Sequence, residues 1–165
     1  MSLDLYFLRH GQAGNRADWQ GDDAKRPLTV EGTRRMEREA SAIKKLGLPL
    51  DLIISSPLVR AYQTAEIVAK AQSSSIRLIT DDRLGPGFDP EQLAAILAQH
   101  RRAKGVMLVG HEPDLSETIG QVTGGSRLTM KKGALAYVEM EDPASLQGEL
   151  LWLIPPKVLE FSGRG

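Results

Sequence analysis

The stretch Leu5-Tyr6-Phe7-Leu8-Arg9-His10-Gly11 decides how this chain folds. Its aromatic and aliphatic side chains predict a buried strand, and Gly11 predicts a turn where the strand ends. Ligands bind at the carboxyl ends of the strands in open α/β sheets. An arginine beside a histidine at such an end can hold an oxyanion while an imidazole nitrogen attacks it. The tripeptide Arg9-His10-Gly11 alone is also compatible with a surface Arg-His pair in a loop.

Length and composition narrow the class of protein. The 165 residues predict one domain over 1–165, large enough to bury a sizeable core. Lys and Arg together number 21, as do Asp and Glu, so no overall field attracts nucleic acid or an anionic membrane. The absence of cysteine excludes a disulfide framework, a thiolate nucleophile and cysteine-ligated zinc.

The first residues and the histidines add two expectations. Residues 1–4 contain no basic segment and no apolar run approaches the length that spans a bilayer, so we expect a cytoplasmic protein. The histidines are His10, His100 and His111, and no two of them have metal-ligand spacing. His100 shares a predicted helix face with apolar residues, which favours a partly buried or helix-end position over a catalytic one.

A second apolar segment leads directly into a helix. Residues 51–55 predict a strand, with Ser56 as the N-cap of the next helix and Pro57 at its first position. A helix start offers free backbone N–H groups to an anion. Arg60, on the first turn, can reach the same place. An ordinary exposed helix arginine is the alternative.

A third segment ends in a histidine. Residues 106–110 predict a buried strand that ends at His111, and Pro113 opens the helix that follows. Two histidines and an arginine are therefore expected at strand ends, with a second arginine at a helix start. This convergence favours a site over scattered surface residues.

The segments between these strands have simpler interpretations. Residues 12–26 predict a long polar loop, which we interpret as a flap over the site. Trp19 in this loop either contacts a ligand or pins the loop to the body of the protein. Thr29 is the expected N-cap of a helix that runs to about Leu46 and ends at Gly47.

The second half of the chain continues the alternation. Residues 76–80 predict a strand, and Asp89 is expected to cap the helix that follows. Residues 133–140 and 149–154 predict an antiparallel hairpin at the edge of the sheet. Residues 157–165, after two prolines, are expected to form a tail.

Four motifs occur in order over about the first two thirds of the chain. They are Leu8-Arg9-His10-Gly11; Arg26-Pro27-Leu28-Thr29 with Gly32; Ser55-Ser56-Pro57 with Arg60-Ala61 and Gln63-Thr64; and Val109-Gly110-His111 with Pro113. Together they resemble the histidine phosphatase superfamily, also called phosphoglycerate mutase-like, and within it the small bacterial SixA-type phosphohistidine phosphatases. The resemblance implies an α/β fold of three layers, α/β/α, with a mostly parallel central sheet.

The same resemblance implies roles for five residues. His10 would be the nucleophile that accepts the phosphoryl group. Arg9 and Arg60 would hold the phosphate oxygens, and His111 would donate a hydrogen bond to them. Arg26 matches an arginine that precedes Pro-Leu-Thr in SixA-type proteins, and is a further candidate for contact with phosphate or substrate. Neither a metal nor an organic cofactor is required.

The chemistry sets two further conditions. Phosphoryl transfer depends mainly on positioning and on neutralising three equatorial oxygens, which arginine does with bidentate donors. His10 must be neutral at its attacking nitrogen. We therefore expect a backbone carbonyl to accept the N–H of its other ring nitrogen, with the Gly11 turn as one candidate.

One position departs from the mutases and phosphomonoesterases of the family. These carry a carboxylate shortly after the third strand as general acid for the leaving alkoxide, where this chain has Leu84-Gly85-Pro86. An alkoxide needs a proton as it departs, whereas a protonated phosphohistidine ring leaves as neutral imidazole. The gap, which SixA-type proteins share, favours a phosphoramidate substrate. The mutases also place an asparagine where this chain has Arg16.

Three functions follow in order of preference. The first is a phosphohistidine phosphatase acting on a protein phosphohistidine, such as a phosphotransfer domain of a signalling relay, with phosphate as product. The second keeps the nucleophile but takes small phosphate esters as substrates, with Asp81, Asp82 or Glu112 supplying the proton. The third is a non-catalytic phosphate-binding module, against which the complete set of two histidines and two arginines argues.

Overall fold

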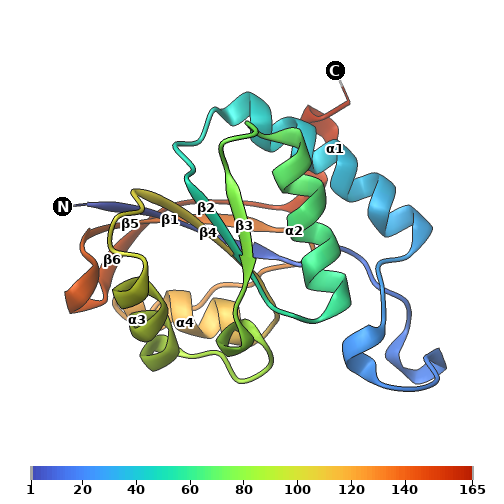
Figure 1. The fold of residues 1–165 in the computed structure, drawn as a ribbon, viewed down its shortest axis with the longest axis horizontal. Coiled ribbons are helices and arrows are strands. Elements are labelled where there is room, and N and C mark those ends of the chain that lie inside the picture. Colours follow the sequence, from blue (N-terminus) through green and yellow to red (C-terminus); the bar gives the residue numbers. More distant parts are fainter. Residues whose placement is uncertain (1, 165) are drawn as a thin grey trace.

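Residues 2–164 of the chain are described by a computed structural model, and within them six strands form one sheet (Figure 1). The strands are β1 (Leu3–Arg9), β2 (Leu52–Ser55), β3 (Arg77–Thr80), β4 (Gly105–Gly110), β5 (Leu135–Asp142) and β6 (Gln147–Ile154). Their order is β3-β2-β4-β1-β5-β6, and the first four are parallel. β5 runs antiparallel to both β1 and β6, so the expected edge hairpin is confirmed.

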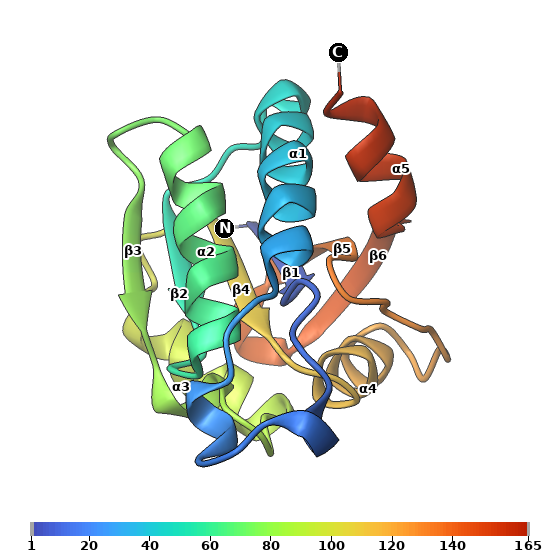
Figure 2. The ribbon, with the colours of Figure 1, turned by 90° about the vertical axis from the view of Figure 1, so that its right-hand side faces the viewer.

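Helices cover both faces of this sheet. They are α1 (Val30–Leu46), α2 (Val59–Ala71), α3 (Pro90–Gln99), α4 (Asp114–Val122) and α5 (Pro156–Ser162). α1, α2 and α5 pack on one face and α3 and α4 on the other (Figure 2). This is the three-layer α/β/α arrangement that the family resemblance implies. Within residues 2–164, no helix combines the length and the apolar composition needed to cross a membrane.

β1 lies between two neighbouring strands and between two helical layers. Leu5 and Phe7 pack in the core below α3 and α4, whereas Tyr6 and Leu8 pack below α1 and α2. Because both faces are covered, the strand is a continuous apolar run and does not alternate with polar residues. Burial of each such side chain contributes about 1.5–3 kcal/mol. The stretch that carries the candidate arginine and histidine is therefore among the most firmly held parts of the chain.

α1 begins and ends where the sequence predicts. The Thr29 hydroxyl oxygen accepts a hydrogen bond from the Gly32 N–H at 2.8 Å, as an N-cap does. At the other end Gly47 has a φ of 62°, in the left-handed region that favours glycine. One face of the helix is buried, and it includes Met36, Ala40 and Ile43.

The start of α2 differs from the expectation. The helix begins at Val59, and the predicted N-cap, Ser56, lies before it. The reason is that the Ser56 N–H donates to the carbonyl oxygen of Val109 at 2.9 Å, which extends the pairing of β2 with β4 by one residue. The chain then needs residues 57–58 to turn into the helix. The Ser56 hydroxyl is thereby left for another partner, described below.

The expectation of a tail over residues 157–165 is wrong for most of that range. Residues 156–162 form α5, with Pro156 at its first turn, where the missing N–H of proline is tolerated. Leu159 is buried in the core on the α1 face of the sheet, and Glu160 forms an ion pair with Arg38 of α1 at 2.6 Å. The two prolines therefore lie at the start of a short helix and do not mark the end of regular structure. Residue 165 lies outside the described residues.

A prediction concerns the contact between α1 and the segment after β1. The Thr29 N–H donates to the carbonyl oxygen of Gln12 at 3.1 Å, and a Cβ on Gly32 would collide with that oxygen. We expect Gly32→Ala to lower the free energy of unfolding by about 1–3 kcal/mol, as overpacking does. Alanine in an unobstructed helix would instead be stabilising by about 1 kcal/mol.

Urea denaturation of the two chains measures this effect. Gly14→Ala is the matched control, because nothing lies within 4 Å of a Cβ at that position. A Gly32→Ala chain more stable than the parent would show that the close approach of Gln12 to α1 is not needed.

Candidate active site

The parallel pairing of β1 with β4 brings two histidines together. Arg9 lies opposite Gly110, and the His10 N–H donates to the Gly110 carbonyl oxygen at 3.1 Å. His10 and His111 each follow their strand directly, so they leave the sheet side by side. Their ring centroids are 5.2 Å apart with planes tilted by 53°. Both histidines are 6% exposed.

The tautomer of His10 is fixed by one hydrogen bond. Its Nδ1 lies 2.7 Å from the carbonyl oxygen of Gly11, which can only accept, so Nδ1 carries the hydrogen. The other ring nitrogen, Nε2, then has a free lone pair. Burial, together with the nearby His111, Arg60 and Arg9, lowers the pKa of His10 to about 3. The expected partner of the ring, a carbonyl of the Gly11 turn, is confirmed, and the lowered pKa favours the neutral imidazole.

His111 is oriented by Ser56. The Ser56 hydroxyl accepts from the Leu58 N–H at 3.2 Å and lies 2.7 Å from His111 Nε2. The hydroxyl hydrogen is satisfied if it is donated to Nε2, and the neutral ring then carries its hydrogen on Nδ1. Burial lowers the pKa of His111 to about 4, with Arg60 and Arg9 as further causes.

The Nδ1 atom of His111 has no partner. It is buried and makes no hydrogen bond within the described part of the chain. A buried polar atom without a partner costs free energy, so such atoms mark places where a ligand can supply the missing hydrogen bond. An oxyanion beside His10 would meet this requirement.

Two arginines lie next to the histidines. Arg9 is the last residue of β1, and its Nη1 donates to the Met130 carbonyl oxygen at 2.9 Å. Arg60 is on the first turn of α2 and is 6% exposed. The Nε atoms of both are buried without a partner among the described residues. Burial lowers the pKa of each guanidinium, because desolvation disfavours the charged form.

A carboxylate from the loop contacts these arginines, and no pattern in the sequence marks it for the site. Asp23 accepts from Arg60 Nη2 at 3.1 Å and from Arg26 Nε at 2.9 Å. Its backbone carbonyl also accepts from Arg60 Nη1 at 2.9 Å. The hydrogen bond from Arg26 is the main cause that lowers the pKa of Asp23. Arg26 thus joins the arginine group through a shared carboxylate.

Thr64 is a second residue that sequence reasoning did not assign to the site. Its hydroxyl accepts from the Gly11 N–H at 3.0 Å and donates to the carbonyl oxygen of Arg60 at 2.8 Å. It therefore fixes the turn after His10 against the helix that carries Arg60. The signal was present in the sequence, since Thr64 lies one helical turn after Arg60.

The other singled-out residues have structural partners. Trp19 donates its indole N–H to the Asp22 carbonyl oxygen at 2.9 Å, and so ties the loop to itself. Asp89 caps α3 by accepting from the Gln92 N–H, as expected. His100 is the C-cap of the same helix, which confirms its helix-end position.

Two of the three candidate proton donors, Asp81 and Glu112, are engaged elsewhere. Asp81 forms an ion pair with Arg83 at 2.6 Å, and this hydrogen-bonded arginine lowers its pKa. Glu112 accepts from the N–H and the hydroxyl of Ser116, at 2.8 and 2.6 Å. Asp82 begins the short 3-10 helix 82–84. The segment that ends this turn lies close to the site, because a Cβ on Gly110 would be 3.5 Å from the Leu84 carbonyl oxygen.

Comparison with known proteins places this arrangement in a family. Residues 5–85 match the histidine phosphatase superfamily, branch 1. An uncharacterized protein of Picosynechococcus sp. is 37% identical over 171 residues, covering 95% of this chain and 99% of that protein. The probable phosphoglycerate mutase GpmB of Proteus mirabilis is 40% identical over 86 residues, which are 50% of this chain but only 37% of GpmB.

Solved structures show the same fold. The protein histidine phosphatase SixA, in complex with tungstate, superposes with a TM-score of 0.83 at 24% identity, covering 95% of this chain and 99% of that one. A phosphoglycerate mutase from Bacillus anthracis superposes with a TM-score of 0.78 at 14% identity, covering 99% and 97%. Fold, motif match and full-length relative agree. The chain belongs to the histidine phosphatase superfamily.

Proposed function

We propose that this chain is a phosphohistidine phosphatase that removes phosphate from a protein phosphohistidine through a phosphorylated His10. The observation that carries the proposal is the state of His10. Its ring is buried, neutral and held by the Gly11 carbonyl with Nε2 unprotonated, beside two guanidinium groups. A group that only binds phosphate would not need an unprotonated nitrogen among cations.

The first step transfers the phosphoryl group to the protein. His10 Nε2 attacks phosphorus while the P–N bond to the substrate imidazole breaks. That imidazole leaves neutral, because its other nitrogen already carries a proton. Arg9 and Arg60 neutralise the three equatorial oxygens, and His111 Nδ1 is the donor left free for one of them.

The second step releases phosphate. Water attacks the phosphorus of phosphorylated His10, and the P–N bond breaks with its electron pair returning to Nε2. Both protons of the water remain with the phosphate, and His10 is neutral again with its hydrogen on Nδ1. Neither step needs a carboxylic acid. The segment Leu84-Gly85-Pro86 near Gly110 provides none.

Small phosphate esters are the second candidate substrates. The partial match to GpmB and the position of Glu112 favour this reading, since Glu112 is next to His111 and its charge acts on Arg9. Its carboxylate would have to leave Ser116 to deliver a proton to an alkoxide. That requirement makes it the less favoured function.

Substrate comparison tests the proposal. We expect fast loss of phosphate from a phosphohistidine-bearing protein, slow hydrolysis of an activated aryl phosphate, and none of an alkyl phosphate, because only the alkoxide needs an acid. His10→Ala should lose activity on all of them by about 10³-fold or more, since it removes the nucleophile. Alkyl ester hydrolysis as fast as phosphohistidine hydrolysis would instead establish the second candidate function.

The protonation state of the histidines can be measured directly. With pKa values of about 3 and 4, His10 and His111 should remain neutral at pH 5, where an unperturbed imidazole with a pKa of about 6.5 is mostly charged. Nitrogen-15 NMR of the labelled chain distinguishes the two forms, with free histidine in the same buffer as reference and His10→Gln and His111→Gln for assignment. Charged imidazolium at both sites at pH 5 would remove the observation on which the proposal rests.

A further prediction concerns Asp23. Its carboxylate occupies donors of Arg60 and Arg26 that a phosphate would also use, so it competes with the ligand for them. Asp23→Asn should therefore lower the inhibition constant of inorganic phosphate by about 3- to 10-fold, a typical effect of one nearby charge. The exposed Asp18, in the same loop, supplies the control Asp18→Asn. Weaker inhibition in Asp23→Asn would mean that Asp23 mainly positions Arg60.

A further inference from the structure

A cavity of about 800 Å³ lies beside the histidine pair, between α1, α5 and the segment before β5. It shares Arg9 and Gly11 with the site, but neither His10 nor His111 lines it. We call it the basic cavity, after the six cationic residues in its lining: Arg9, Arg35, Lys131, Lys132, Lys157 and Arg164.

Most of this positive charge is not balanced. Of the two carboxylates in the lining, Glu160 pairs with Arg38 and Arg164, and Arg35 pairs with Glu31 outside the cavity. Four cations remain that form no ion pair with a carboxylate of residues 2–164, namely Arg9, Lys131, Lys132 and Lys157. In a chain with no net charge, such a local excess is a binding feature for anions.

The second carboxylate, Glu39, does not offset the excess. It is 2% exposed, and its Oε2 is buried without a hydrogen-bond partner in the described chain. Burial, together with the charge of Glu160, raises its pKa to about 9, so the group is a neutral acid at pH 7. A neutral carboxyl is a hydrogen-bond donor. The lining thus offers an anion a donor where an ionised glutamate would repel it.

The basic cavity adjoins the candidate active site, because Arg9 and Gly11 belong to both. Burial lowers the pKa of Lys132, and so do the charges of Arg9, Arg26 and Arg60, so Lys132 lies within the electrostatic influence of the site. A protein substrate with its phosphoryl group at His10 would therefore have neighbouring residues near the cavity.

We propose that the basic cavity binds the carboxylates of aspartate and glutamate side chains that flank the phosphohistidine on the substrate protein. This inference rests on the proposed function, and it assigns the enzyme a partner whose phosphorylated surface is acidic. The volume admits several side chains at once. The lysines come from two segments, Lys131 and Lys132 before β5 and Lys157 in α5. They end in flexible single charges, which suit carboxylates of varied geometry. Phe161, 77% exposed in the lining, offers apolar contact to the same surface.

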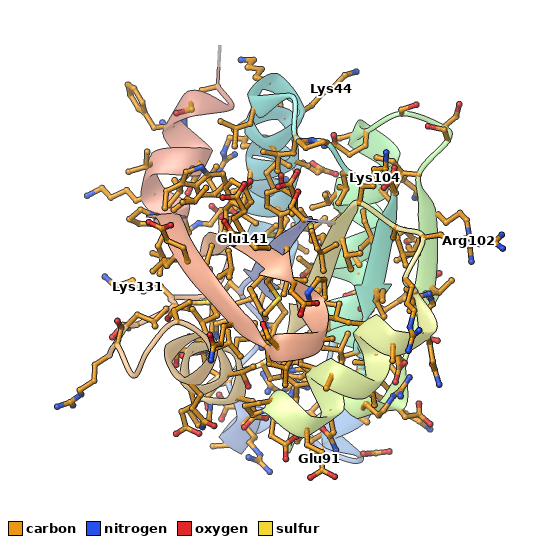
Figure 3. All side chains as sticks on the ribbon, turned by 90° about the vertical axis from the view of Figure 1, so that its left-hand side faces the viewer. Lys44, Glu91, Arg102, Lys104, Lys131 and Glu141 are labelled. Carbon is orange, nitrogen blue, oxygen red and sulfur yellow. The ribbon has the colours of Figure 1, made fainter. Side chains whose placement is uncertain are left out.

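The experiment compares two phosphohistidine peptides that differ only in their flanking residues, glutamate in one and glutamine in the other. We expect kcat/KM for the glutamate peptide to be at least about 10-fold higher at low salt, mainly through KM, and the preference to shrink as salt is added. The double variant Lys131→Glu with Lys157→Glu should lose this preference. The control is Arg102→Glu, since Figure 3 shows Arg102 on the opposite side of the molecule from Lys131.

Binding of the unphosphorylated glutamate peptide, followed by fluorescence anisotropy, separates this inference from the proposed function because it needs no turnover. Inability to hydrolyse either phosphopeptide would count against the proposed function alone. Equal use of both peptides by the parent, or a preference retained by the double variant, would overturn the role of the cavity. Tight binding of pyrophosphate with no binding of the peptide would assign the cavity to a small polyanion and overturn it as well.

Discussion

The parallel pairing of β1 with β4 is the constraint on which the site depends. It aligns the last residues of two strands that are far apart in the sequence, so that His10 and His111 emerge together. Neither strand could be shifted by one residue, because Leu5 and Phe7 would then exchange faces with Tyr6 and Leu8. The packing of the core therefore fixes the strand register, and the register fixes the position of the two histidines.

Burial and positive charge act on the site in the same direction. Both remove the proton from the imidazoles, and both strengthen the attraction for an oxyanion. The cost is a group of guanidinium ions with few partners, which Asp23 partly offsets. When such a site is empty, its cationic donors lack partners, and a doubly charged phosphoryl group supplies them.

The sequence predicted the framework well because its signals are local. The apolar run of β1, the Thr29 cap and Gly47 each depend on neighbouring residues, and each was found where expected. The family motifs likewise identified Arg9, His10, Arg60 and His111, which the structure brings into one corner. Two predictions were wrong, namely Ser56 as the N-cap of α2 and residues 157–165 as a tail. Ser56 could equally extend β2, and Pro156 could begin a helix as well as follow the end of a strand, and only tertiary contacts decided between these roles.

Other features could not be predicted from the sequence, because they depend on contacts between distant segments. Nothing local marks Asp23 among the acids of its loop, or Glu39 among those of α1.

The pairing of Leu3 with Met140 has a consequence for synthesis. During translation β1 is made first, yet both of its neighbours arrive more than a hundred residues later. The nascent chain therefore carries this apolar segment without its strand partners until β4 and β5 are made, and an exposed apolar segment of this kind is prone to aggregation.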